Sequence, residues 1–204
     1  MLLLFSCKTG ITGEPVPEKK APLFSRFSIE QTRELEKTFE EIKNLRPGTL
    51  KTDATLYKRL TTFKKLFGFS LDGKKLLQWV LKRVNKVTYK NSWTVAVNEN
   101  KGNFLLGDAF FNRLSMVERL YLLIHEARHS DNGGYKHVRC PENFKFVSAG
   151  QPDMKLSGNF GCDDKQDGAY AFQAAFLFEL FAYGIFDQKE VGLLYNSSVS
   201  RIIH

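Results

Sequence analysis

Residues 115–131 read SMVERLYLLIHEARHSD, and this stretch has the pattern of an amphipathic helix. Ser115 and Glu118 have the spacing of a capping box at the start of a helix. The apolar residues recur at helical spacing and share one face: Met116, Val117, Leu120, Leu123, Ile124 and Ala127. We therefore expect a helix over 115–129, with this face packed in the protein core.

The opposite face of this helix carries an H-E-x-x-H motif, formed by His125, Glu126 and His129. At about 100° per residue the two histidines lie about 40° apart, so both imidazoles can reach one metal ion. Glu126 points to the side of that ion, where its carboxylate can act as a general base toward water. The motif therefore predicts a zinc site with His125 and His129 as ligands.

In this context the motif resembles that of the zincin class of zinc metallopeptidases. More narrowly, HEARHSD at 125–131, with Cys-Asp at 162–163 and Gly-Ala-Tyr at 168–170, is similar to a group of uncharacterised bacterial lipoproteins. The resemblance implies an α+β, zincin-like fold: N-terminal helices, a small antiparallel sheet whose edge strand binds an extended peptide, the motif helix and a buried C-terminal helix. It also implies His125 and His129 as zinc ligands, Glu126 as the general base, and a peptide or protein substrate.

The third zinc ligand is left open by the motif. Metzincins have a glycine three residues and a histidine six residues after the second motif histidine, where this chain has Asn132 and Tyr135. His137 is the next histidine, and the glycine-rich turn before it can absorb two extra residues, so we favour it as third ligand. The alternatives are Glu179, Asp131, Asp163 and Asp164. In purely structural roles, Arg128 would pair with Glu179 or Asp131, and the acidic pair would cap a helix starting at Gly168.

A peptidase also needs a hydrogen-bond donor for the oxyanion that forms during hydrolysis. Tyr135 and Tyr170 are candidates because both lie near the motif or near glycine. Of the two, we assign Tyr170 to the catalytic set.

Further helices are expected over 28–45, with Ser28 and Gln31 as a capping box, and over 53–67, 72–86 and 168–186. The last of these is apolar around its circumference, and Glu179 near its middle favours a buried helix over a membrane span. Short β-prone runs at 87–89, 93–97 and 103–106, with a turn at 98–102, predict the small antiparallel sheet.

The amino terminus resembles a lipoprotein signal, since Leu4-Phe5-Ser6-Cys7 is similar to a lipobox. This resemblance implies acylation of Cys7, a membrane anchor, and an extracytoplasmic location on the periplasmic or outer-membrane face. We expect residues 1–24 to be a lipobox remnant and flexible tether. Residues 25–204 would form a single domain, with a basic helical part at 25–90 and a sheet and metal-site part at 91–204.

Cys140 and Cys162 are then the remaining cysteines, and outside the cytoplasm we expect them to form a disulfide. The competing interpretation is a structural zinc site made by these two cysteines and His137.

The 204 residues are 43% hydrophobic and 25% charged, which excludes wholesale disorder. The net charge of +8 comes from the N-terminal helices: residues 1–90 hold 19 basic and 9 acidic side chains, against 11 and 13 in residues 91–204. No aromatic residues alternate with these lysines as a base-stacking surface would need, so we expect no nucleic-acid partner. The sequence therefore predicts a zinc-dependent metallopeptidase. The alternative is a catalytically inactive zincin-fold lipoprotein that binds a metal or a partner.

Overall fold

The motif helix is α6 (Met116–Arg128) in the computed structural model, which describes residues 23–92, 95–131, 135–144, 146 and 156–203. Ser115 and Glu118 make both hydrogen bonds of the predicted capping box. The predicted apolar face is buried, with Val117, Leu120, Leu123, Ile124 and Ala127 at most 1% exposed. This face anchors α6 in the core, so the motif residues are held on a rigid element.

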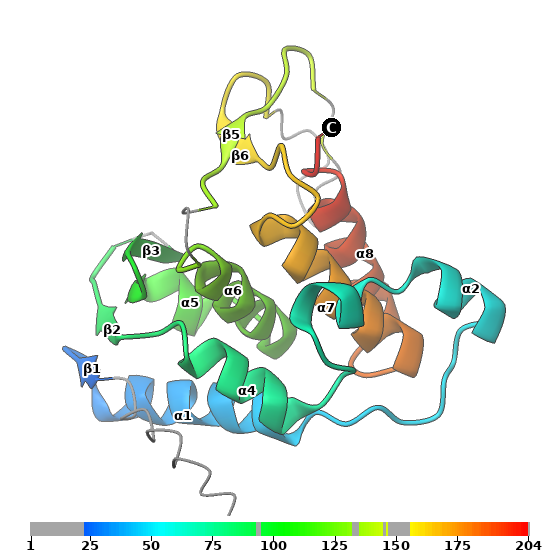
Figure 1. Ribbon diagram of the computed structural model, residues 1–204. Helices are drawn as coiled ribbons and strands as arrows, with labels where there is room; N and C mark the ends of the chain where they lie inside the picture. The colour runs from blue at the N-terminus through cyan, green and yellow to red at the C-terminus, as the bar shows by residue number, and fades with distance from the viewer. Residues whose placement is uncertain (1–22, 93–94, 132–134, 145, 147–155, 204) are drawn as a thin grey trace, which may run out of the picture.

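A four-stranded sheet lies beside α6, with strand order β1-β2-β4-β3 (Figure 1). Strand β2 (Lys86–Tyr89) pairs parallel with β1 (Leu23–Ser25) on one side and with β4 (Asn103–Leu106) on the other. Strand β3 (Ala96–Asn100) pairs antiparallel with β4. The α+β class is confirmed, and β3 and β4 pair antiparallel as predicted. The sheet as a whole is mixed, not antiparallel, because β2 pairs parallel with both β1 and β4. The chain passes beyond β2 to form β3 at the outer edge and returns between them as β4, so β4 pairs parallel with β2. The prediction assumed that strands consecutive in the sequence pair with each other, which is a tendency of sheets and not a rule; here β2 and β3 are consecutive but do not pair.

Two of the N-terminal helices, α1 (Ile29–Asn44) and α4 (Gly73–Leu81), lie along the lower side of the molecule in Figure 1, and α2 (Ala54–Leu60) lies at its right-hand side. The predicted helix over 28–45 is α1, and its capping box at Ser28 is formed. The predicted 53–67 helix is two helices, α2 and α3 (Phe63–Phe67), because Thr61 is extended. The predicted 72–86 helix is α4, which ends early because the chain turns into β2.

Helix α7 (Ala169–Tyr183) is the predicted buried helix and packs between α6 and α8 (Gln188–Val199). Nearly all its side chains are buried, Glu179 among them at 2% exposed. Within the described part of the chain, none of the helices combines the length and apolar character needed to cross a membrane. Two of the described helices were not predicted from the sequence, α8 and the short α5 (Asp108–Asn112).

A small hairpin of β5 (Val138–Arg139) and β6 (Phe160–Cys162) projects above α6 and α7. Cys140 and Cys162 are joined by a disulfide in it and are 2% and 0% exposed. Both sulfur atoms are therefore occupied, and the alternative cysteine zinc site is wrong. The C-terminal segment is tied to the hairpin, because Asp163 N–H donates to the Arg201 carbonyl and Ile203 N–H donates to the Asp163 carbonyl.

The proposed lipobox and Cys7 lie outside the described residues. Leu23 and Phe24, which we assigned to the tether, belong to β1. The sheet also draws β1 and β2 from the basic helical part of the chain, so the two proposed parts of the domain share one sheet.

Candidate metal centre

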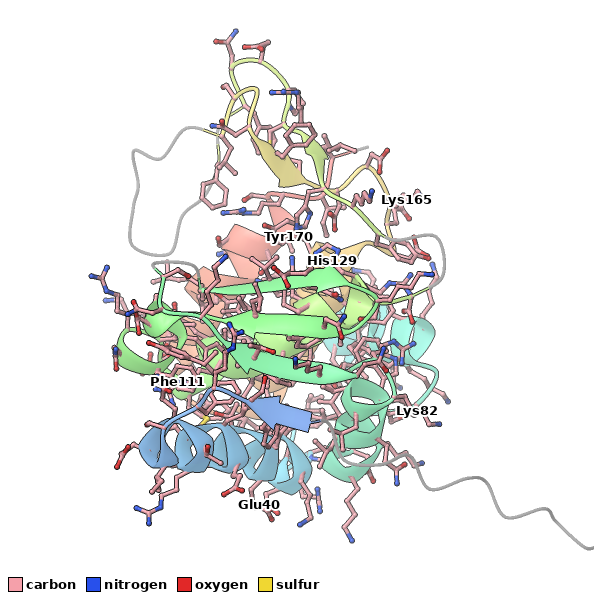
Figure 2. All side chains as sticks on the ribbon, turned by 90° about the vertical axis from the view of Figure 1, so that its left-hand side faces the viewer. Glu40, Lys82, Phe111, His129, Lys165 and Tyr170 are labelled. Carbon is pink, nitrogen blue, oxygen red and sulfur yellow. A yellow bond between two sulfur atoms is a disulfide. The ribbon has the colours of Figure 1, made fainter. Side chains whose placement is uncertain are left out.

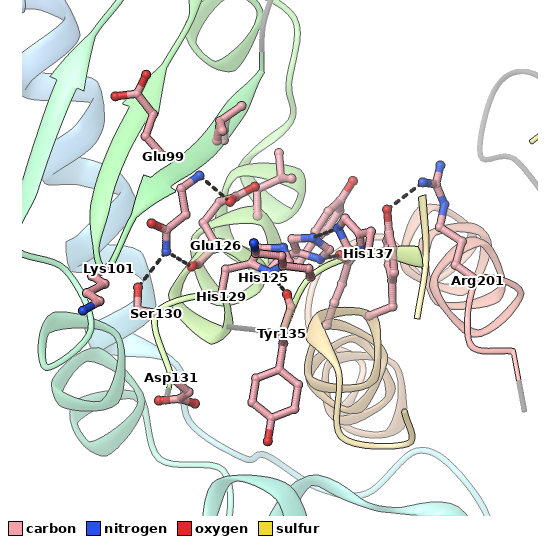
Figure 3. A pocket seen from close by; sticks show the side chains of 18 of the residues that line it. Glu99, Lys101, His125, Glu126, His129, Ser130, Asp131, Tyr135, His137 and Arg201 are labelled. Atoms are coloured by element: carbon pink, nitrogen blue, oxygen red, sulfur yellow. Dashed lines mark hydrogen bonds between the residues drawn. The ribbon is translucent and has the colours of Figure 1, made fainter. Parts of the chain in front are cut away.

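Three histidines meet above the middle of the molecule, at the places where α6 ends and the β5 hairpin begins. His125 lies in α6, His129 is the C-cap residue of that helix, and His137 comes from the segment just before β5. One ring nitrogen from each lies within 4.8 Å of the others, so the three are close enough to hold a metal ion. Figure 2 places His129 and Tyr170 between the sheet and the hairpin, and Figure 3 shows the three histidines at close range.

Each imidazole is held in place through its Nδ1 atom. His125 Nδ1 lies 2.9 Å from the side-chain oxygen of Gln173, and His137 Nδ1 lies 2.8 Å from Asp163 Oδ1. His129 Nδ1 contacts the backbone carbonyl of Tyr135. All three partners are acceptors, so each Nδ1 carries its proton. Metal-binding histidines in proteins are fixed by partners of this kind, with the other nitrogen left for the metal.

The Nε2 atoms of His125 and His137 face each other at 3.1 Å. Because both Nδ1 atoms donate, a neutral ring at each position would point a lone pair at the other. Burial lowers the pKa of His125 well below its ordinary value, and the charges of His129 and His137 lower it further. Burial also lowers the pKa of His129. Protonation of His125 is therefore disfavoured, whereas a metal ion bound between the two nitrogens would satisfy both lone pairs. The 3.1 Å separation is close to the roughly 3.3 Å between two nitrogen ligands of a tetrahedral zinc ion.

Glu126 lies beside the three histidines and is 7% exposed. Its Oε2 accepts a hydrogen bond of 2.8 Å from the backbone N–H of Asn98, in β3. The Asn98 side chain also donates to the Glu126 carbonyl, at 2.8 Å, so strand and helix are joined at this point. Burial raises the pKa of Glu126 to about 7, with the Asn98 hydrogen bond acting in the opposite direction. A carboxyl group of this kind exchanges its proton near neutral pH.

A cleft of about 1000 Å³ opens over the histidines. The strand β3 forms one wall and the end of α8 the other, and the histidines and Glu126 lie on the floor (Figure 3). The site is therefore accessible to a ligand much larger than water.

The other candidates for the third ligand are occupied elsewhere. Glu179 accepts hydrogen bonds from Tyr57 at 2.9 Å and from Thr61, at the far side of α7, and it does not pair with Arg128. Asp131 does pair with Arg128, as its structural role predicted. Asp163 accepts a hydrogen bond from His137 Nδ1 through one carboxylate oxygen. Its other oxygen accepts a hydrogen bond of 2.8 Å from the Tyr170 N–H, which caps α7. Asp164 is exposed.

Both tyrosine candidates line the cleft, and they differ in their hydrogen bonds. Tyr135 donates its hydroxyl hydrogen to Asp167 at 2.9 Å. Tyr170 lines the cleft, and its ring centroid lies 4.7 Å from that of His125 and 4.8 Å from that of His137. Its phenol oxygen accepts a hydrogen bond of 2.6 Å from Arg201. Burial raises the pKa of Tyr170, while Arg201 acts to lower it, so the phenol keeps its proton.

Sequence reasoning missed three residues that shape this site: Gln173, Asn98 and Arg201. Gln173 had a signal, since it is one of the few polar residues in the apolar stretch that forms α7. Asn98 and Arg201 had none, because they reach the site only through the folding of distant segments.

Comparisons with protein-family models, curated proteins and solved structures gave no match to this chain, so its function is argued from the site itself.

Proposed function

We propose that this protein is a zinc-dependent hydrolase of the metallopeptidase type. The observation that carries the proposal is the pair of facing Nε2 atoms of His125 and His137, 3.1 Å apart, each ring fixed through its Nδ1 atom, with His125 buried and its pKa lowered by burial. A site built in this way is stabilised by a metal ion. Three histidines with one side open to a cleft are a ligand set typical of catalytic zinc.

When bound, zinc would supply a Lewis acid that polarises a carbonyl group and makes water more acidic. Glu126 would then accept the proton of the attacking water. A pKa of about 7 suits this role, because a general base works best when its pKa lies near the working pH.

Tyr170 would donate its hydroxyl hydrogen to the oxyanion of the substrate. The Arg201 N–H occupies one acceptor position of the phenol oxygen, which leaves the O–H hydrogen to point elsewhere. The phenol ring lies against His125 and His137 and lines the cleft, so its O–H group would meet a substrate oxygen on the cleft side.

A peptide would lie along β3, which is an edge strand of the described sheet. Edge strands can bind extended peptides through their free backbone groups. The strand runs along the cleft wall and contacts Glu126 through Asn98, so an extended peptide bound there would pass the histidines.

The test has two steps. Purified protein is first analysed for metal, with His125→Ala as the control, and we expect about one zinc per chain that is lost in the variant. Zinc-loaded wild type and Glu126→Gln are then compared on a mixed peptide library by mass spectrometry. Cleavage by wild type alone supports the proposal. Absence of bound zinc after zinc supplementation would overturn it, and zinc binding without cleavage would favour the inactive metal-binding lipoprotein.

The extracytoplasmic location and the lipid anchor at Cys7 are part of the proposal. The Cys140–Cys162 disulfide supports them, because structural disulfides persist in oxidising compartments. Expression in a bacterium with a labelled fatty acid would test the anchor, with label expected on wild type and lost in Cys7→Ala.

A further inference from the structure

A second hollow opens beside the metal cleft, starting at Ser130, the residue that follows His129. Its volume is about 320 Å³. Its lining consists of Lys82, Arg83, Asn85, Lys101, Ser130 and Asp131, and the last three of these also line the metal cleft. In Figure 3, Lys101, Ser130 and Asp131 lie on one side of the histidines and Arg201 on the other. A ligand in the cleft can therefore extend into this hollow, which we call the side pocket.

The side pocket is cationic. Three of its lining residues are positively charged, and Asp131 is the one carboxylate among them. Asp131 is already compensated, because it accepts a hydrogen bond of 2.7 Å from Arg83 and another from Arg128. Within the described part of the chain, Lys101 makes no ion pair. The pocket therefore has positive charge to offer an anionic group.

The wall that carries Lys101 is fixed in position. Asn85 donates its side-chain N–H to the Lys101 carbonyl at 2.6 Å, and its backbone N–H to the Gly102 carbonyl at 2.8 Å. Gly102 packs so closely that a Cβ atom there would lie 2.4 Å from the Arg83 carbonyl oxygen. The turn between β3 and β4 is thus locked against the end of α4, and the pocket is formed before a ligand arrives.

Lys101 has a positive φ of 41°, and Gly102 follows with a φ of 91°. Asparagine followed by glycine is the favoured pair for two such residues in a hairpin turn, and lysine is disfavoured at the first position. Lysine thus occupies this position against the backbone preference. A residue kept in an unfavourable conformation points to a role for its side chain.

We infer that the side pocket is a subsite for an acidic side chain of the substrate. This inference rests on the proposed function and names the substrate class: peptides with an Asp or Glu near the scissile bond. Lys101 follows Asn98 by three residues, and Asn98 contacts Glu126. An extended peptide that runs along β3 would therefore place the acidic residue about three residues, or roughly 10 Å, from the bond that is cut.

Binding of peptides to zinc-loaded Glu126→Gln protein tests the inference. The probes are fluorescein-labelled heptapeptides with blocked C-termini, in which a single Glu occupies one position at a time, each with a matched Gln peptide. We expect the Glu peptide to bind about tenfold more tightly at one or two adjacent positions, and this preference to decrease as salt is raised. The preference should disappear in Lys101→Asn. Lys64→Gln, which removes an exposed lysine of α3, is the control and should keep it.

Lys101→Asn is informative because asparagine suits the positive φ, so its unfolding midpoint should equal or exceed that of wild type. Loss of the preference in a variant at least as stable as wild type therefore reports on the side chain alone. Equal binding of Glu and Gln peptides, or a preference that survives Lys101→Asn, would overturn the inference. The two proposals fail separately: a Glu preference without cleavage by wild type contradicts the peptidase alone, and cleavage without a Glu preference contradicts the subsite alone.

Discussion

His137 and Asp163 are joined by a hydrogen bond of 2.8 Å although 26 residues separate them. His137 comes just before β5 and Asp163 just after β6, so this bond crosses the hairpin that the Cys140–Cys162 disulfide closes. The third histidine of the candidate metal centre is thus oriented by a buried carboxylate from another segment, 3% exposed.

Asp163→Asn is expected to weaken zinc binding about 10- to 100-fold, because the carboxylate fixes the orientation and the tautomer of the His137 ring. Competition with a chromogenic chelator measures the affinity. Asp164→Asn is the matched control, since Asp164 is the exposed neighbour and is not among the hydrogen-bond partners of the three histidines. Equal affinities for the two variants would contradict a role for Asp163.

The double variant Cys140→Ala/Cys162→Ala is expected to lose about 3 kcal/mol of unfolding free energy, the value for a cross-link that closes a loop of this length. Zinc affinity should fall as well, because His137 and Asp163 flank the two half-cystines. Denaturant unfolding and chelator competition measure the two effects. A reducing agent should change the wild type and leave the double variant unaffected; an unfolding midpoint equal to that of wild type would contradict the prediction.

Glu126 should make the chelator-treated protein less stable as pH rises. Its pKa in the folded state is raised to about 7, so between about pH 4.5 and 7 the folded state binds more protons than the unfolded state and stability decreases. The loss over this range is roughly 3 kcal/mol. His125 and His129 act in the opposite sense, since their pKa values are lowered, but they do so in both proteins that are compared.

Denaturant unfolding of wild type and Glu126→Gln at pH 5 and pH 7.5 isolates this contribution, because only the wild type carries the titrating carboxyl. We expect Glu126→Gln to gain stability relative to wild type at the higher pH. A constant difference between the two pH values would show that Glu126 does not titrate in this range.

Glu179→Gln should leave zinc binding unchanged, whereas His137→Ala should lower it sharply. Glu179 accepts hydrogen bonds from Tyr57 and Thr61 instead of facing the histidines. Its loss should appear in stability, at about 1–3 kcal/mol, because one half-buried hydroxyl would face the amide N–H₂ group without an acceptor. Metal analysis and denaturant unfolding separate the two effects, and zinc loss in Glu179→Gln would refute the assignment of His137.

Tyr170→Phe is expected to lower kcat by about 10²- to 10³-fold on a cleaved peptide, with zinc content and KM little changed. Tyr135→Phe is the control, because its hydroxyl is bonded to Asp167. Steady-state kinetics on one peptide measures both variants. Equal kcat values would exclude Tyr170 as the oxyanion donor.

The features that could be predicted from the sequence are those that depend on the spacing of residues along the chain. The helical period predicted α6, its buried face and the shared side of His125 and His129. The spacing of Ser115 and Glu118 predicted the capping box at its start. The buried character of α7 follows from its apolar circumference, and the disulfide from the count of cysteines.

Tertiary structure decided which distant segments meet. From the sequence, His137 and four carboxylates were all candidates for the third ligand. In the structure, the hairpin packs so that His137 lies beside His125 and His129, whereas Glu179 is hydrogen-bonded to Tyr57 elsewhere. The order of the strands could not be predicted from the sequence either, because strand pairing depends on contacts between residues far apart in the chain. The edge position of β3 follows from that order. Periodicity fixes the face of a helix, whereas convergence of separate elements depends on how the whole core packs.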